Sequence, residues 1–372
     1  MLWRPEEHVP LTRQEWDPDV ARDAIAEIVE DAEAAADDGT WPNHPLDEVP
    51  QDERFCSVYL GGAGMIWGLH KLGSSIDVTT ALSAVLRRYR ASAAGEEAEH
   101  PPSLLLGETG ILAVAQKLNA PVADQGRLAD LVRANREHET WELLFGSPGT
   151  MIAARACGLA HEWRDSAELL YNHWDPSTDM WTHDLYGEIR PFLGAGHGFA
   201  SNVQALRGYV DDDVLRARVT RLLTRTAHYE DGLVNWAPMN RPWSEQEPTI
   251  RVQWCHGAPG MIITLADLMP PDLAISGGEL TWRAGPLRKG SGLCHGTAGN
   301  GFAFLKLYEL TGDPSWLHRG RRFAMHAISQ VARDRRHYGR GRYTLWTGDI
   351  GAALYVKACL DADSAFPITD TF

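Results

Sequence analysis

The apolar residues of this chain recur at the spacing of helices with one buried face. Met65, Ile66, Leu69 and Leu72 fall on one side of a helix, and residues 261–268 repeat the same stripe. Runs of this kind carry few charged residues. They are predicted to form inner, mostly buried helices.

More polar stretches separate these runs, and each of them is rich in charge on one face. This pattern predicts outer helices with a solvent-exposed side. They are Val78 to Arg90, Gln125 to Arg136, Asp212 to Tyr229 and Pro314 to Arg333. A first helix, from about Pro18 to Ala36, is expected to pack on the structure that the others form.

A Gly-x-x-Gly element comes before most of the apolar runs. The pairs are Gly61/Gly64, Gly107/Gly110, Gly146/Gly149, Gly257/Gly260, Gly296/Gly299 and Gly348/Gly351. A seventh copy begins at His197-Gly198 and has Ser201 in place of the second glycine. The copies follow one another at intervals on the order of 40 to 60 residues, which is the length of a helical hairpin repeat.

A helical hairpin leaves one apolar face uncovered, so hairpins must stack to bury it, and a closed ring leaves no uncovered end. The expected fold is therefore all-α: an α/α toroid of seven helical hairpins, with an inner and an outer ring of helices. We expect one domain over residues 1–372, in which residues 1–50 supply a helix and a loop that pack on the ring. Irregular segments are expected to cap its open end; they are Thr40 to Pro50, Trp174 to Pro191 and Asn235 to Pro248.

Charge and composition narrow the classes of function. The 372 residues carry a formal net charge of −15, which disfavours nucleic acid or an anionic membrane as the main partner. The chain has neither a signal-peptide pattern at Met1 nor an apolar run of about 20 residues that would span a membrane. Five cysteines without framework spacing indicate free thiols in a reducing compartment, so we expect a cytoplasmic protein.

Two of the glycine elements contain the residues of a metal site. Residues 255–260 read Cys-His-Gly-Ala-Pro-Gly and residues 294–299 read Cys-His-Gly-Thr-Ala-Gly. Cys255, Cys294 and His295 form a three-ligand set for one Zn²⁺ that leaves the fourth position open, as in catalytic zinc sites. A turn repeated in two neighbouring hairpins would bring them together at one end of the barrel. The alternative is that these are buried core residues, and His256 is expected beside the metal rather than on it.

The repeat and the ligand set together resemble the lanthionine synthetase C-like proteins over nearly the whole chain. The most specific stretches are residues 253–260 and 288–296, supported by residues 194–198. The His after the first Cys and the sequence Ala-Phe-Pro at 365–367 resemble the eukaryotic-type, glutathione-binding members more than the lantibiotic cyclases. The resemblance implies a zinc-dependent enzyme that forms a thioether by adding a thiol to dehydroalanine or dehydrobutyrine in a peptide or protein. The thiol would be a small one such as glutathione, or a peptide Cys.

Four further residues are candidates for the site, His197 from its place in the repeat and the other three from the resemblance. His197 lies at the turn position equivalent to His256 and His295 and is the candidate acid that protonates the α-carbon. Arg251 matches a functional arginine of the cyclases, and Glu142 stands where they carry an active-site Asp, from where it would orient His197 or assist proton transfer. Lys289 matches a lysine of the glutathione-binding members that meets a carboxylate of the tripeptide.

Other functions remain open at this stage. A lanthionine-forming peptide cyclase would use the same chemistry, and a zinc-containing scaffold would bind glutathione or a protein without turnover. Toroid glycosidases line their cleft with aromatic residues, and this chain has 14 Trp, but no paired carboxylates stand at the glycine turns. Zinc-dependent prenyl transferases share only the architecture.

Overall fold

The computed structural model describes residues 1–47, 49–50, 53–93, 101–185, 187–245 and 250–372, and these contain 14 α-helices. Seven follow the glycine turns: α2 (Gly62–Lys71), α4 (Glu108–Lys117), α6 (Ser147–Ala156), α8 (Phe199–Leu206), α10 (Ala258–Leu265), α12 (Thr297–Thr311) and α14 (Asp349–Asp361). The others are α1 (Pro18–Ala34), α3 (Val78–Ala93), α5 (Gln125–Asn135), α7 (Ala160–Asn172), α9 (Asp212–Thr226), α11 (Pro271–Ala284) and α13 (Pro314–Tyr338). Short 3₁₀ helices cover Pro5–Glu7, Pro45–Asp47 and Trp243–Glu245. The prediction of an all-α fold is confirmed.

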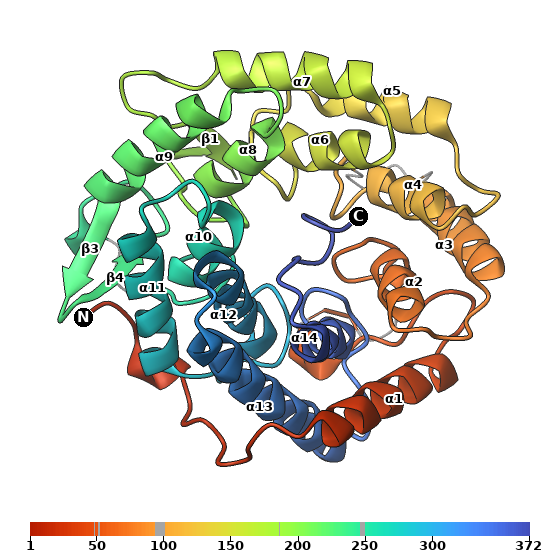
Figure 1. Cartoon of the computed structure of the whole chain (residues 1–372). Coiled ribbons are helices and arrows are strands. Elements are labelled where there is room, and N and C mark those ends of the chain that lie inside the picture. The colour runs from red at the N-terminus through yellow and green to blue at the C-terminus, as the bar shows by residue number, and fades with distance from the viewer. Residues whose placement is uncertain (48, 51–52, 94–100, 186, 246–249) are drawn as a thin grey trace.

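The helices that follow the glycine turns form a closed inner ring (Figure 1). Each contacts the next, from α2 through α4, α6, α8, α10 and α12 to α14, and α14 contacts α2. The remaining helices lie around the outside of this ring. Helix α14 is covered by α1, from the opposite end of the chain, so the first and last helices close the circle together.

Burial follows the hydrophobic pattern of each helix. The inner helix α4 is buried from Glu108 to Ala115. Glu108 is the one charged side chain in this buried stretch. A buried carboxylate needs a compensating charge. Arg90 of α3 and Arg127 of α5 provide it, with N–O distances of 2.7 and 2.8 Å. The outer helices thus supply both an apolar lining and the counter-charges that the inner ring requires.

The second glycine of the repeated element marks a close crossing of backbone over helix. A Cβ atom at Gly260 would lie 1.9 Å from the Trp254 carbonyl oxygen, and one at Gly299 would lie 1.9 Å from that of Leu293. No side chain larger than hydrogen fits there. In the turn that carries His197, Ser201 takes this place and its hydroxyl donates to the Gly198 carbonyl at 3.0 Å.

Backbone hydrogen bonds join the glycine turns side by side. We call this set of bonds the turn belt. It consists of Gly196 N–H to Cys255 O (3.3 Å), Cys255 N–H to Cys294 O (3.2 Å), Cys294 N–H to Trp346 O (2.9 Å), Trp346 N–H to Tyr59 O (3.5 Å) and Tyr59 N–H to Leu105 O (2.9 Å). The belt gathers at one end of the ring residues that lie far apart in the sequence.

Two small antiparallel sheets depart from the purely helical prediction. Strands β1 (His183–Leu185) and β2 (Glu188–Arg190) pair with each other, as do β3 (Ala227–Glu230) and β4 (Leu233–Trp236). The first pair lies within the predicted irregular segment Trp174 to Pro191. The segment predicted from Asn235 to Pro248 begins inside β4; its residues 246–248, like residue 48 of the segment Thr40 to Pro50, lie outside the described residues.

The predicted outer helix from Asp212 to Tyr229 was too long. Helix α9 ends at Thr226, and the chain continues directly as β3. Asp231 and Gly232 follow with φ values of 52° and 75°. This Asp-Gly pair has the left-handed conformation of a type I′ hairpin turn, and the strand pairing on both sides of it overrides the helical periodicity.

The other helix boundaries differ from the predictions by a few residues. Helix α1 ends at Ala34, and α13 continues to Tyr338, where Gly339 terminates it in the left-handed conformation with φ 71°. Among the described residues, no helix has both the length and the apolar character needed to cross a membrane. The expectation of one domain over the whole chain stays a prediction.

Candidate functional site

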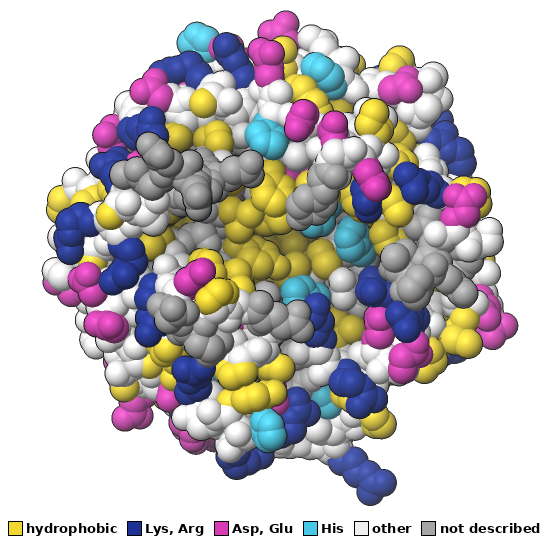
Figure 2. Space-filling model, turned by 180° about the vertical axis from the view of Figure 1, so that it is seen from behind, with side chains coloured by type: hydrophobic (Ala, Val, Ile, Leu, Met, Phe, Trp, Pro, Cys, Tyr) yellow, Lys and Arg dark blue, Asp and Glu magenta, His cyan; other side chains and the backbone are white. Residues whose placement is uncertain are grey.

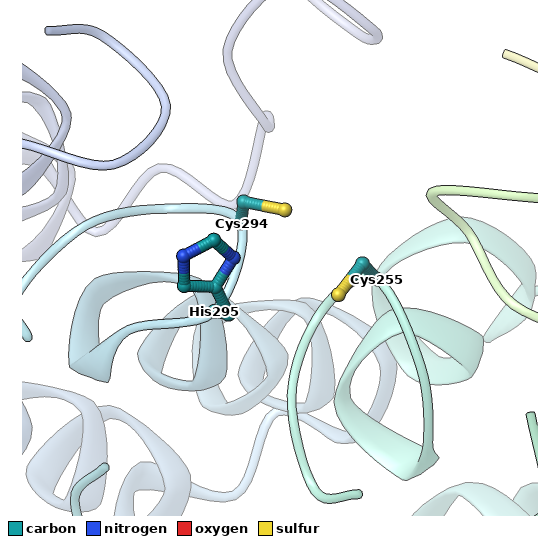
Figure 3. Close-up of side chains that lie close together, drawn as sticks. All are labelled: Cys255, Cys294 and His295. Carbon is teal, nitrogen blue, oxygen red and sulfur yellow. The ribbon is translucent and has the colours of Figure 1, made fainter. Parts of the chain in front are cut away.

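Cys255, Cys294 and His295 converge from the turns that precede α10 and α12 (Figure 3). One sulfur or nitrogen atom of each lies within 4.8 Å of the others. The two cysteines are buried, at 7% and 6% exposure, whereas His295 is partly exposed. The sulfur atoms are therefore shielded by the protein while one side of the group remains accessible.

These three donors suit a zinc ion. Zn²⁺ takes thiolate sulfur at about 2.3 Å and imidazole nitrogen at about 2.0–2.1 Å, so donors must be brought close together to share it. The group contains two soft sulfur ligands and one imidazole. Such a set leaves one tetrahedral position of the ion for an exogenous ligand. The donor chemistry and the spacing fit the ion that the sequence led us to expect.

The two thiols interact with each other and shift each other's pKa in opposite directions. The Cys255 thiol hydrogen-bonds to Cys294 and holds the pKa of Cys294 well below its ordinary value against the opposing effect of burial; His295 and Tyr59 also lower it. The same hydrogen bond, together with burial, raises the pKa of Cys255 well above its ordinary value. The pair thus readily gives up one proton and retains the other.

His197 and Glu142 form a second pair of interacting side chains. The imidazole Nδ1 of His197 lies 2.8 Å from Glu142 Oε2, and Glu142 is fully buried while His197 is 22% exposed. The backbone N–H groups of Leu144 and Phe145 donate to the two Glu142 oxygens at 2.9 and 2.7 Å. Glu142 is thus fixed from behind, and it fixes the orientation of the imidazole.

Electrostatics favour the charged form of both members of this pair. Burial by itself would lower the pKa of His197, but the hydrogen bond and the charge of Glu142, with a contribution from Cys294, raise it above its ordinary value. Burial would raise the pKa of Glu142, but His197 and the backbone N–H groups lower it. The N–H of Gly196, next to His197, donates to the Cys255 carbonyl at 3.3 Å, so His197 lies beside the turn that carries Cys255.

His256 lies beside this pair rather than in the donor group. Its ring stacks on that of His197, with centroids 5.9 Å apart and an interplanar angle of 23°, and it also contacts Phe192. Burial, followed by the charges of His197 and Arg251, lowers the pKa of His256 to about 3. It is therefore a neutral side chain that packs against the candidate acid.

The other two predicted residues lie at the margin of the site. Arg251 Nη1 forms an ion pair with Glu7 at 3.0 Å, and its charge reaches His256. Lys289 is exposed, and its positive charge acts on Cys255. Lys289 also lines a small recess with His295, Arg342 and Thr347. All seven predicted site residues thus lie near one end of the ring.

Two residues that the sequence did not single out touch the sulfur atoms. Gln253 Nε2 donates to Cys255 Sγ at 3.0 Å. The Tyr59 hydroxyl hydrogen-bonds to Cys294, although Tyr59 precedes it by more than two hundred residues. Gln253 could have been predicted from the sequence, because it lies only two residues before the candidate ligand Cys255. Tyr59 stands in the first glycine turn, and only the turn belt brings it to Cys294.

Two relatives match parts of this chain. A 45% identical stretch of 80 residues, 20% of either chain, is shared with "Glutathione S-transferase LANCL1" of Danio rerio. "LanC-like protein GCL1" of Arabidopsis thaliana is 37% identical over 145 residues, 34% of this chain and 32% of that protein. These alignments thus span about a fifth and a third of the relatives' own lengths.

The fold has a solved counterpart. The structure named "Nisin cyclase" superimposes with a TM-score of 0.52 at 14% identity, covering 93% of this chain and all of that one. At this identity the likeness concerns the toroid alone. The sequence model of the lanthionine synthetase C-like proteins matches residues 12–371, almost the entire chain. The chain therefore belongs to the lanthionine synthetase C-like protein family.

Proposed function

We propose that this protein holds one Zn²⁺ through Cys255, Cys294 and His295 and adds a thiol to dehydroalanine or dehydrobutyrine residues of a peptide or protein. The single observation that carries the proposal is the convergence of these donors beside the His197–Glu142 pair. A bound Zn²⁺ would hold an incoming thiol as a thiolate near neutral pH, where a free thiol with a pKa near 8.5 is mostly protonated. The donor set and the acid then serve the two halves of one addition.

His197 supplies the proton that completes the addition. When the thiolate sulfur bonds to the β-carbon, the double-bond electrons move toward the carbonyl, and the α-carbon must then receive a proton. Nδ1 of His197 is held by Glu142, which leaves Nε2 to face the substrate. Since Glu142 favours protonated His197, the imidazolium is available as an acid close to neutral pH.

Arg251 and Lys289 would assist at the edges of the reaction. The Arg251 guanidinium is 28% exposed and is oriented by Glu7, so it would offer a fixed positive charge to the developing enolate oxygen. Lys289 would meet a carboxylate of the thiol substrate. These two positive charges would thus assist the addition without taking part in proton transfer.

The acceptor would enter from the face shown in Figure 2. That face is hollowed at its centre, with hydrophobic side chains on the floor and histidines beside them. An apolar hollow suits a peptide segment around a dehydrated residue, whose side chain is small and uncharged. We propose that the acceptor peptide binds in this hollow and that glutathione or a similar small thiol binds on the Lys289 side.

The name of the Danio rerio relative supports a small thiol, and the name of the solved toroid supports a peptide substrate. All five cysteines are free, as the proposed ligands must be, which supports a reducing compartment and thus the cytoplasm. We also propose that the ring consists of seven hairpins, in which α1 is the outer partner of α14; the contacts of α1 with α14 support this arrangement.

The decisive experiment is mass spectrometry of a dehydroalanine-containing peptide incubated with glutathione and the zinc-loaded protein. We expect enzyme-dependent gain of one glutathione, lost in Cys294→Ala and strongly reduced in His197→Ala. Cys157→Ala is the matched control, because Cys157 is a buried cysteine outside the site. Metal content is measured on the same samples.

The failing outcomes point to the alternatives. Zinc-loaded protein that forms no adduct with glutathione but closes a thioether ring in a peptide with its own Cys would be a cyclase. Protein that binds glutathione in the same way with or without His197, and forms no product, would be a scaffold. An adduct that persists at the normal rate in Cys294→Ala would refute the proposed role of the metal site.

A further inference from the structure

Each sulfur atom of the candidate zinc site accepts a hydrogen bond from a neutral side chain outside the donor set. Gln253 Nε2 donates to Cys255 Sγ at 3.0 Å, and the Tyr59 hydroxyl is close enough to Cys294 to hydrogen-bond with it. There is one donor for each sulfur. The thiol addition described above gives neither residue a task.

Both donors are held in place by contacts of their own. The Gln253 backbone N–H donates to the His256 carbonyl at 3.1 Å within the same turn. Tyr59 belongs to the turn belt through its N–H and its carbonyl, and its ring stacks on Trp346 with centroids 5.8 Å apart and an interplanar angle of 12°. The two hydrogen bonds therefore arise from two different segments of the chain, each fixed independently.

The proposed reaction creates a need for such donors. Dehydroalanine is an electrophile, and on the accessible side of the donor group it would approach a bound thiol next to the thiolates of Cys255 and Cys294, which are themselves nucleophiles. If one of them attacked, its sulfur would bond to the β-carbon, the α-carbon would take up a proton, and the protein would lose a ligand. A hydrogen bond draws charge from a thiolate and reduces its nucleophilicity.

We propose that Tyr59 and Gln253 are positioning residues that restrain the two ligand thiolates, so that the incoming thiol, and not the protein's own sulfur, reacts with the acceptor. This inference rests on the proposed function, because it presumes a metal-bound thiolate pair facing an electrophile. It explains how the incoming thiolate, rather than that of Cys255 or Cys294, would be the one that reacts.

The test measures the reactivity of the ligand sulfurs without either substrate. Zinc-loaded protein is treated with iodoacetamide, whose carbon bonds to sulfur as iodide leaves, and modified Cys255 and Cys294 are quantified separately by peptide mapping. We expect Tyr59→Phe to accelerate alkylation of Cys294 about tenfold and Gln253→Met to accelerate that of Cys255 by a similar factor. Each variant should leave the other sulfur unchanged.

Tyr355→Phe is the matched control for loss of a buried hydroxyl. The Tyr355 hydroxyl donates to the Gly320 carbonyl at 2.6 Å, away from both sulfurs, so neither alkylation rate should change. Tyr59→Phe keeps the ring that stacks on Trp346 and removes only the donor. Zinc-loaded variants with wild-type alkylation rates, or with both sulfurs accelerated together, would overturn the inference.

A second readout reports the sulfur atoms directly. In protein loaded with Co²⁺, the sulfur-to-metal charge-transfer band should move to lower energy in Tyr59→Phe and in Gln253→Met, because each thiolate regains electron density. Tyr355→Phe should leave the band in place, and unshifted bands in the two site variants contradict the inference. Wild-type protein that retains no metal refutes the proposed function as well, whereas metal-loaded variants that behave as wild type refute only the restraint.

Discussion

The two Cys-His-Gly turns are near copies in sequence, yet their histidines lie in different surroundings. His295 joins the two cysteines in the donor group, whereas His256 stacks on His197. The glycine that follows each histidine differs in conformation. Gly257 has a φ of 113°, in the region that favours glycine, while Gly296 has a φ of −136°, which any residue can adopt.

The turn that carries His197 has the same glycine conformation as the turn that carries His256. Gly198, after His197, has a φ of 119°, and His197 and His256 lie ring to ring. The conformation of this glycine thus separates the turn of the proposed metal ligand from the turns of the proposed acid and its neighbour.

The largest difference between the two turns is expected when His295 and His256 are each replaced by alanine in separate variants. We expect His295→Ala to lose its zinc, since one of three protein ligands is gone. His256→Ala should keep about one zinc per chain, with affinity changed by at most about 10–100-fold as for a neighbouring residue. Elemental analysis after dialysis against a weak chelator measures both. Loss of zinc from His256→Ala alone would reverse the assignment.

His197→Ala tests whether the turn with positive φ carries the acid. We expect the rate of thiol addition to fall by about 10²–10⁴-fold, the usual contribution of a general acid, with zinc content unchanged. His256→Ala is the comparison variant, and its rate should fall far less. The rates are measured under single-turnover conditions, and equal losses in the two variants would deny His197 a special role.

The pH dependence of kcat/KM tests the effect of Glu142 on His197. Because Glu142 raises the pKa of His197, the acid stays protonated above the ordinary histidine range and is lost only as pH rises through that raised value. Glu142→Gln removes the charge, so the pKa of His197 should fall and the alkaline limb of kcat/KM should move to lower pH. A limb that does not move would show that another group limits the reaction at high pH.

The smallest expected effect concerns stability. Ser201→Gly gives the His197 turn the second glycine that the other turns carry, but it removes the hydrogen bond to the Gly198 carbonyl and places glycine in a helix. We expect a loss of about 1–2 kcal/mol in the free energy of unfolding. Urea denaturation measures it. An unchanged or higher stability would mean that Ser201 does not compensate for the missing glycine.

The repeat made the all-α ring and the grouping of Cys255, Cys294 and His295 predictable, since equivalent positions of neighbouring repeats must lie together. His197 was also named in advance from its place in the repeat, and Glu142 from resemblance to the family. The sheets were not predicted because each pairs only a few residues. The predicted helix from Asp212 extended beyond the end of α9 because helical periodicity carries no information about the strand pairing that begins at Ala227.

The sequence by itself determined which residues turn, which are buried and which can hold a metal, because glycine spacing, apolar periodicity and side-chain chemistry are properties of short segments. Only the tertiary structure decided that the His256 ring stacks on His197 and that Tyr59 meets Cys294. Those outcomes depend on backbone dihedral angles and on closure of the ring. Closure of the ring places the first glycine turn beside the last ones, and a pattern in a short segment of the sequence contains no information about that contact.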